Sequence, residues 1–297
     1  MILAFMEDYI AYLRSIERLG TAQNYCCTQR SLSHYLEGKD IPFSALTEKL
    51  IVNYEQWLKK REVTRNTISF YMRILRSVCR KADGKKRQII DQVFSNVYTG
   101  VDRTKKKAVN EEVIFRLTKM NLDGNKPLAY ARDLFLFSFY TRGMSFVDMA
   151  FLKRSNLHDD FIQYVRHKTS QYISIRLEPC MTAIIDRYHN DSLPYLFPIV
   201  KIKNATPEYN QYQNALCYYN KQLKRLSALL QLPFPLSSYT ARHTWATLAR
   251  NYNIPLPVIS AGMGHSSTLI TQIYLATLDH SQVDEANSVV LSKILKG

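Results

Sequence analysis

A helix expected near the C-terminus carries the residues best suited to bind a phosphate. It reads SSYTARHTWATLARN from Ser237 to Asn251, and either of its two leading serines can cap it. Tyr239 and Arg242 are three residues apart, which puts them on one face of the helix. An arginine held on a packed helix is pre-organised, and its planar guanidinium matches the oxygens of a phosphate. His243 points about 100° away around the helix, where we expect it to brace the fold.

The segment that follows brings a histidine and a tyrosine close together in sequence. It reads VISAGMGHSSTLITQIYLAT from Val258 to Thr277; its glycines end one helix, and the serines after His265 cap another. Tyr274 then lies about two turns inside that second helix. A tyrosine hydroxyl has a pKa of about 10, so it is a poor nucleophile at neutral pH unless cations or a base help to remove its proton. Arg242 and His265 would supply that environment.

Upstream, the sequence predicts a β-hairpin with a charged tip. Apolar residues flank His167-Lys168-Thr169-Ser170, at Phe161 and Tyr164 before it and at Ile173, Ile175 and Leu177 after it, and the run after the tip alternates. Lys168 therefore stands at the turn, where a long cationic side chain can reach a neighbouring phosphate. The alternative is an ordinary exposed lysine of a turn, and His167 beside it is expected to be only a strand residue.

These motifs and their spacing resemble the tyrosine recombinase and phage-type integrase family. Ala-Arg-His-Thr-Trp-Ala-Thr is followed about two dozen residues later by Gly-His-Ser-Ser, and a tyrosine stands nine residues past that histidine. The resemblance implies a site-specific recombinase that cleaves and rejoins duplex DNA through a 3′-phosphotyrosyl intermediate, without metal, ATP or other cofactor. By this resemblance Tyr274 is the nucleophile, Arg242 and His265 serve the phosphate, and Lys168 is the acid that protonates the leaving 5′-oxygen.

The first arginine of the family pattern is where this sequence departs from it. The family has Gly-x-Arg-x-x-Glu at a helix start, and aligning Gly143 and Asp148 puts Ser145 at the arginine's place. We expect Arg142 to deliver its guanidinium from one turn away, because a branch resembling conjugative-transposon integrases and DNA invertases shares such an Arg-Gly-Met segment. The alternative is that Ser145 takes the position and an arginine from elsewhere completes the site.

Two further residues of the pattern carry expectations of their own. Asp148 matches an acidic position that supports the site from behind, so we expect it to orient an arginine; the alternative is an acid favoured by the helix dipole. Tyr239 stands where the family usually has a histidine. Its hydroxyl can donate a hydrogen bond to a phosphate oxygen, which would leave most of the proton handling to His265.

The first 82 residues read as a small bundle of four amphipathic helices. The expected helices run over 2–18, 22–37, 47–61 and from residue 64 onward, with Gly20-Thr21 as the stop and cap between the first two. The fourth helix carries a basic face that we expect to contact DNA phosphates, and the alternative is a solvated face; its residues are Arg65, Arg73, Arg76 and Arg80.

The expected fold class is mainly α with a small antiparallel sheet. A helical, SAM-like core-binding domain would occupy residues 1–98, and an α+β catalytic domain of the tyrosine recombinase type would occupy 111–297 with a helical tail. Between them, residues 99–110 (TGVDRTKKKAVN) are polar and lack apolar periodicity, which is typical of a linker. Its basic residues, Lys105, Lys106 and Lys107, would lie along a DNA backbone.

Composition agrees with a polyanionic partner. The 297 residues hold 40 Lys+Arg against 25 Asp+Glu, a formal net charge of +15, and both halves of the chain are basic. A hydrophobic share of 46% excludes general disorder. No apolar run reaches the length of about 18 residues that spans a bilayer. The five cysteines form no CxxC pair, so we expect a reduced cytoplasmic protein without a disulfide framework or a zinc site.

The resemblance also implies partners. Four protomers would pair two duplex DNA sites in a synaptic tetramer, the free protein would be monomeric or weakly associated, and accessory DNA-bending proteins can assist. The tail, 279–297, would pack on a neighbouring protomer, with packing on its own domain as the alternative. Two other functions stay open, a DNA-binding member that has lost cleavage and a type IB topoisomerase-like relaxation activity. A metal nuclease is disfavoured, because no paired carboxylates stand at ligand spacing.

Overall fold

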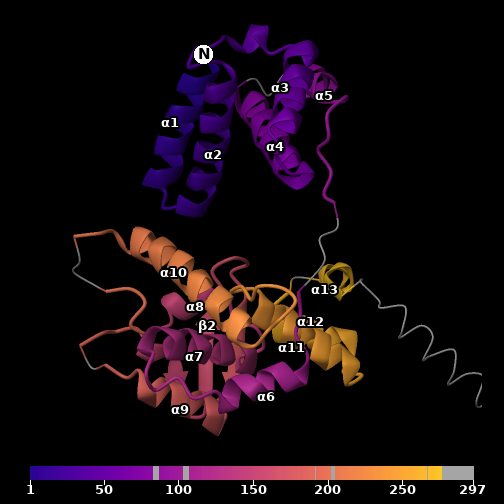
Figure 1. Cartoon of the computed structure of the whole chain (residues 1–297). Coiled ribbons are helices and arrows are strands. Elements are labelled where there is room, and N and C mark those ends of the chain that lie inside the picture. Colours follow the sequence, from indigo (N-terminus) through magenta and orange to yellow (C-terminus); the bar gives the residue numbers. More distant parts are fainter. Residues whose placement is uncertain (83–86, 103–106, 191, 202–204, 266, 276–297) are drawn as a thin grey trace, which may run out of the picture. The chain divides into compact units, whose positions relative to one another are not determined.

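The computed structural model describes residues 1–82, 87–102, 107–190, 192–201, 205–265 and 267–275 (Figure 1). Of residues 87, 270 and 273–275 it describes the backbone alone. The chain divides into two compact units, residues 1–104 and 105–297. This division falls inside the stretch expected to be a linker, and each unit is described by itself. The expected fold class is confirmed, since the described elements are mostly helices with a small antiparallel sheet.

The N-terminal unit is a helical bundle around its own apolar core. Its helices are α1 (Ile2–Ser15), α2 (Leu19–Tyr35), α3 (Glu48–Lys60), α4 (Arg65–Ala82) and α5 (Arg87–Val93). Thr47 caps α3 as expected, because its side chain accepts a hydrogen bond from the backbone N–H of Leu50 at 3.3 Å. One expectation was wrong: Gly20 and Thr21 lie inside the first turn of α2, and the chain turns earlier, at Glu17, which has φ +58°.

The C-terminal unit is built around α7 (Lys126–Tyr140), which is apolar on nearly all sides. It packs against α6, α9, α10 and α11, so Phe135 and Phe137 are fully buried. The surrounding helices are α6 (Glu111–Lys119), α8 (Phe146–Ala150), α9 (Pro179–Arg187), α10 (Glu208–Leu229), α11 (Thr240–Asn251), α12 (Leu256–Met263) and α13 (Thr268–Leu275). No described helix is both long and apolar enough to cross a membrane.

The sheet of this unit is antiparallel in the order β1 (Leu157–His158), β2 (Phe161–Val165), β3 (Tyr172–Arg176). Ile162 pairs with Ile175, and Tyr164 with Ile173, so the side chains of these two pairs share the buried face. The predicted hairpin is therefore confirmed. Its turn closes where Arg166 N–H donates to Gln171 O and Ser170 N–H donates to Arg166 O, both at 2.9 Å.

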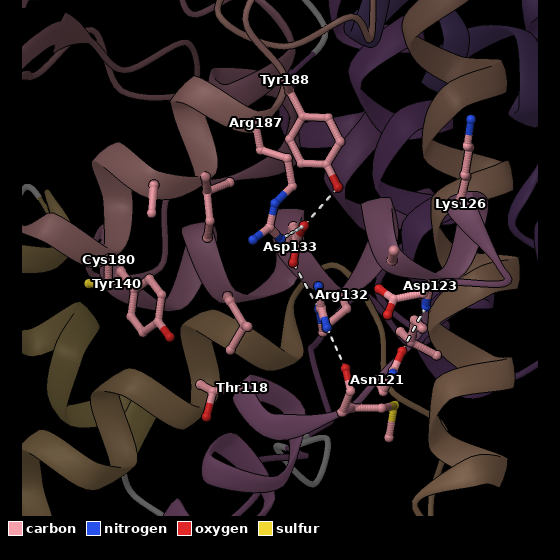
Figure 2. Close-up of a pocket in the computed structure, with 16 residues that line it drawn as sticks. Thr118, Asn121, Asp123, Lys126, Arg132, Asp133, Tyr140, Cys180, Arg187 and Tyr188 are labelled. Atoms are coloured by element: carbon pink, nitrogen blue, oxygen red, sulfur yellow. Dashed lines mark hydrogen bonds and ion pairs between the residues drawn. The ribbon is translucent and has the colours of Figure 1, made fainter.

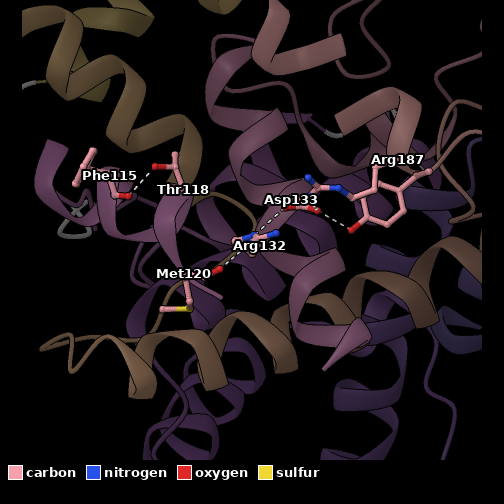
Figure 3. Close-up of polar contacts among 7 residues, drawn as sticks. Phe115, Thr118, Met120, Arg132, Asp133 and Arg187 are labelled. Carbon is pink, nitrogen blue, oxygen red and sulfur yellow. Dashed lines mark hydrogen bonds and ion pairs between the residues drawn. The ribbon is translucent and has the colours of Figure 1, made fainter. Parts of the chain in front are cut away.

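A buried carboxylate ties α7 to α9. Asp133 accepts hydrogen bonds from Arg132 Nε at 2.8 Å, from Arg187 Nη1 at 2.7 Å and from Tyr188 Oη at 2.7 Å (Figures 2 and 3). Arg132 Nη1 also reaches Met120 O at 2.5 Å, which fixes the loop before α7. These residues line a hollow of about 670 Å³. Because the buried acid is satisfied by these donors, we interpret the cluster as a structural brace.

Candidate active site

Seven residues with polar side chains, several of them predicted from the sequence, meet in a small, positively charged hollow of the C-terminal unit. It has a volume of about 90 Å³, room for about three water molecules, and so for a group the size of a phosphate. The residues of its polar lining are Ser145, Arg166, Lys168, Tyr212, Ser238, Tyr239 and Arg242. The described lining holds three cationic side chains and no carboxylate, so the hollow favours an anion.

Arg242 lies in the first turn of α11 and is only 5% exposed. Its Nη1 donates to Gly143 O at 2.9 Å, and its Nη2 donates to Met263 O at 2.5 Å. The loop before α8 and the end of α12 thus converge on one guanidinium. The approach to Gly143 is close: this residue has φ +79°, and a Cβ there would stand 2.6 Å from Arg242 Cα. Only glycine suits both the conformation and the space.

His265 follows Gly264, which ends α12 in the left-handed conformation at φ +62°. Its Nε2 lies 3.1 Å from Arg242 Nη2, and its Nδ1 lies 2.7 Å from Thr271 Oγ1. A guanidinium only donates, so we assign the lone pair to Nε2 and the proton to Nδ1. Burial first, then the nearby charges of Arg242, Arg166 and Lys168, lower the pKa of His265 to about 4. The imidazole is therefore neutral at pH 7 and can accept a proton.

Lys168 is exposed at the hairpin tip, and Asp148 holds that tip in place. Asp148 Oδ1 accepts from His167 N–H at 2.9 Å and lies 3.2 Å from His167 Nδ1, while Oδ2 accepts from Ser145 Oγ at 2.6 Å. Burial alone would raise the pKa of Asp148, but these hydrogen bonds outweigh it and lower the pKa. The expectation that Asp148 orients an arginine was wrong; it joins the start of α8 to the hairpin, and His167 is part of that joint.

Arg142 and Ser145, the two candidates for the first arginine position, lie in different surroundings. Ser145 caps α8 and donates its hydroxyl proton to Asp148. Arg142 has φ +61° in the turn after α7, its Nη1 lies 3.5 Å from Ser174 O, and its Cδ lies 3.5 Å from where a Cβ of Gly262 would be. Arg142 is not among the described residues that line the hollow. Its catalytic assignment stays a prediction.

Two tyrosines complete the predicted site. Tyr239 is 50% exposed at the N-terminal end of α11, lines the hollow, and has its ring centre 6.1 Å from that of His243. Tyr274 belongs to α13, the helix that starts three residues after His265. The side chain of Tyr274 lies outside the described part of the structure, as does the tail, 279–297. The structure thus brings together Lys168, Arg242, His265 and Tyr239.

Sequence reasoning missed Arg166. The residue directly follows β2, and its side chain is only 6% exposed although it is charged. A signal was present: Ile162, Tyr164 and Arg166 are buried and alternate with less buried residues, so the period of two puts an arginine on the buried face of the hairpin. An arginine in that position is unusual and needs a polar partner.

The residues expected to contact DNA in the N-terminal unit differ in how far they are already engaged. Arg80 forms an ion pair with Asp91, and Arg65 lies 3.9 Å above the Tyr98 ring and 3.5 Å from Asp102. Arg73 is exposed and Arg76 partly so, and neither has an ion-pair partner among the described residues. Of the three linker lysines, Lys105 and Lys106 lie outside the described residues. Lys107, in the other unit, has its Nζ 5.9 Å from the Phe234 ring.

Comparisons with known proteins give a family for the first unit and a fold for the chain. Residues 1–96 match the phage integrase SAM-like domain family. A lambda integrase dimer bound to a COC′ core site is similar with a TM-score of 0.66 and 16% identity, over 92% of this chain and 76% of that one. XerH recombinase bound to palindromic difH is similar with a TM-score of 0.64 and 17% identity, over 91% of this chain and 80% of that one. A Tn1549 transposon integrase fragment in complex with circular intermediate DNA is similar with a TM-score of 0.64 and 14% identity, over 97% of this chain and 99% of that one. No curated protein sequence matches.

Proposed function

We propose that this chain is a site-specific DNA recombinase of the tyrosine recombinase family. Its residues 1–96 match the phage integrase SAM-like domain, and its fold is similar to that of lambda integrase. In this proposal it cleaves and rejoins duplex DNA through a 3′-phosphotyrosyl intermediate. The observation that carries the proposal is the hollow itself: three cationic side chains border it, and its described lining holds no carboxylate. One of these cations, Arg242, contacts the neutral His265, which is close in sequence to the helix that bears Tyr274.

The proposed reaction is a transfer of one phosphodiester bond. The Tyr274 oxygen forms a bond to the scissile phosphorus while the bond to the 5′-oxygen breaks. His265, neutral at pH 7, takes the tyrosine proton on Nε2 in place of its hydrogen bond from Arg242, and Lys168 gives a proton to the leaving 5′-oxygen. Arg242 stabilises the charge that builds on the phosphoryl oxygens. The phosphotyrosine keeps the bond energy, so the reverse reaction rejoins the strand without ATP.

DNA and further copies of the chain are the partners of this proposal. The similar solved structures include a lambda integrase dimer on a core site and a lambda integrase tetramer on a Holliday junction. The excess of basic residues supports duplex DNA as the ligand, since phosphate contacts dominate such binding. We propose that four protomers act together, with the tail, 279–297, packed on a neighbour.

A second function is favoured by the two departures from the family pattern. Ser145 stands at the place of the first arginine, and Tyr239 stands at the place of a histidine. A chain that binds specific DNA but does not cleave it is compatible with both. This candidate differs from the first in the product, because it forms no covalent complex.

Covalent capture separates the two functions and does not require the target sequence beforehand. A library of duplexes with a randomised core, each nicked so that the strand downstream of a cut diffuses away, is incubated with the protein. Complexes that survive denaturing detergent are recovered and sequenced. We expect enrichment of an inverted-repeat core with the wild type and no recovery with Tyr274→Phe. Sequence-specific binding without a detergent-stable complex would support the non-cleaving alternative instead.

A further inference from the structure

We infer that Arg166 is a phosphate-binding catalytic arginine of this site and supplies, from the hairpin, the charge that is missing at Ser145. The inference rests on the proposed function, because it assigns a substrate contact for that reaction. It gives the second guanidinium of the site to a residue that no motif in the sequence marks.

The backbone delivers Arg166 into the hollow from the end of β2. The hydrogen bonds of Arg166 to Gln171 and Ser170 close the hairpin turn, so its Cα is fixed two residues before Lys168. Its Nη1 donates to Gly264 O at 2.7 Å, and its Cδ would stand 3.6 Å from a Cβ at Gly264. The side chain is therefore extended towards the loop that carries His265, and it lines the hollow.

The charge of Arg166 has no anionic partner among the described residues. A guanidinium has five N–H donors, and among the described residues only Nη1 of this side chain has a hydrogen-bond partner, the backbone carbonyl of Gly264. The nearby carboxylate of Asp148 is occupied by Ser145 and His167. Burying an unpaired charge is costly, so a side chain that is 6% exposed in this state is prepared for an anion that arrives with the substrate.

Arg166 and Arg242 hold consecutive carbonyl groups of one loop. Arg242 donates to Met263 O and Arg166 to Gly264 O, and His265 is the next residue. Both guanidinium groups border the same small hollow from different elements, the hairpin and α11. A phosphate in a space of about 90 Å³ is within reach of both, which gives the pair of arginines that neutralises its two non-bridging oxygens.

Arg176 provides the matched control. It is an arginine of the same hairpin, in β3, but it is exposed and does not border the hollow among the described residues. It is also absent from the charges that lower the pKa of His265, whereas Arg166 is among them. Replacing each arginine by alanine removes the same charge from two different places.

The test is single-turnover cleavage of a nicked duplex obtained by covalent capture. The full chain is compared as wild type, Arg166→Ala, Arg166→Lys, the control Arg176→Ala and, for the competing candidate of the sequence pattern, Arg142→Ala. Removing a preorganised transition-state donor lowers the rate by about 10²- to 10³-fold, which we expect for Arg166→Ala. Arg166→Lys should lose less, because it keeps the charge without the bidentate fork. The control Arg176→Ala should stay within about tenfold of the wild type.

A second substrate distinguishes a phosphate contact from a structural role. A methylphosphonate at the scissile position has no negative charge, so it no longer needs the arginine that neutralises it. We expect the ratio of wild-type to Arg166→Ala rates to fall to below about tenfold on this substrate. The comparison is made within one folded variant, so a general loss of stability cannot imitate it.

Three outcomes overturn the inference. Normal cleavage by Arg166→Ala does so directly, and so does a methylphosphonate-sensitive loss in Arg142→Ala instead. The third outcome is a cleavage defect of Arg166→Ala that persists on the methylphosphonate substrate but disappears on a substrate with a 5′-bridging sulfur. Because that sulfur leaves without a proton, this result would mean that Arg166 only positions Lys168. In all three the wild type still cleaves; a wild type that forms no adduct with any duplex overturns the proposed function itself.

Discussion

Gly143→Ala tests whether the close approach of two loops at Arg242 sets the geometry of the site. Gly143 has φ +79°, a conformation in which an L-residue costs about 1–2 kcal/mol. The added Cβ would also stand 2.6 Å from Arg242 Cα and Cγ, where ordinary contact begins at 3.4 Å. The loop or α11 must therefore move by nearly 1 Å.

The substitution is expected to affect both the stability of the C-terminal unit and the rate of cleavage. Overpacking of this kind costs about 1–3 kcal/mol, so we expect a total loss of about 2–5 kcal/mol in the free energy of unfolding of the C-terminal unit. A displacement of about 1 Å at a positioned catalytic group lowers the rate by about 100-fold. Gly38→Ala is the matched control, because Gly38 has the same φ of +79° with nothing within 4 Å of the added Cβ. It should cost about 1–2 kcal/mol and leave cleavage unchanged.

The two tryptophans allow each unit to be measured separately. Trp57 lies in the N-terminal unit and Trp245 in the C-terminal unit. Urea unfolding followed by fluorescence in a Trp57→Phe background reports Gly143→Ala, and a Trp245→Phe background reports Gly38→Ala. If Gly143→Ala and Gly38→Ala lose the same free energy of unfolding, and Gly143→Ala cleaves normally, the close approach at Arg242 does not set the geometry of the site.

Three further predictions concern charge. The pKa of His265 is lowered to about 4 in the folded state, against about 6.5 in the unfolded state. The contribution of this group to stability is therefore complete above pH 6.5 and is lost as the pH falls towards 4. After solvent screening, we expect the free energy of unfolding in urea to be about 1–2 kcal/mol lower at pH 4.5, and we expect no such loss in His265→Gln. An equal loss in that variant would contradict this. Arg73→Ala should reduce the slope of log affinity for duplex DNA against log salt concentration by about 1. Arg80→Ala should leave this slope unchanged and lower the free energy of unfolding by at most about 1 kcal/mol. Equal slopes for the two variants would count against a DNA-contacting face made of the arginines without an ion-pair partner. Lys168→Ala should slow cleavage by about 10²- to 10⁴-fold, and a 5′-bridging sulfur should restore it, since that leaving group needs no acid; failure to restore the rate would exclude Lys168 as the acid.

Local patterns were sufficient for the parts of the site that depend on one element. The period of two around Lys168 predicted the hairpin, and helical spacing predicted that Arg242 lies on a packed helix. The two glycines before His265 correctly marked the end of α12, although Gly262 lies within the helix and only Gly264 ends it. In each case the signal and the structure are a few residues apart in the chain.

Contacts between distant segments were beyond such patterns. The partner of Asp148 was expected to be an arginine, but the hairpin places His167 there, 19 residues away in sequence. Arg166 meets Gly264 across 98 residues, so nothing near it in the chain indicates the hollow that it borders. The turn at Gly20-Thr21 was wrong for a different reason: both residue types are favoured at helix starts, and packing of α2 on α1 extended the helix through them.

The most direct measurement is mass spectrometry of the peptide that carries DNA after covalent capture, nuclease digestion and proteolysis. The account predicts a nucleotide mass on the peptide with Tyr274, attached through a 3′-phosphate, and no such adduct from Tyr274→Phe. A nucleotide on another tyrosine, such as Tyr239, or an adduct that persists in Tyr274→Phe, would contradict it.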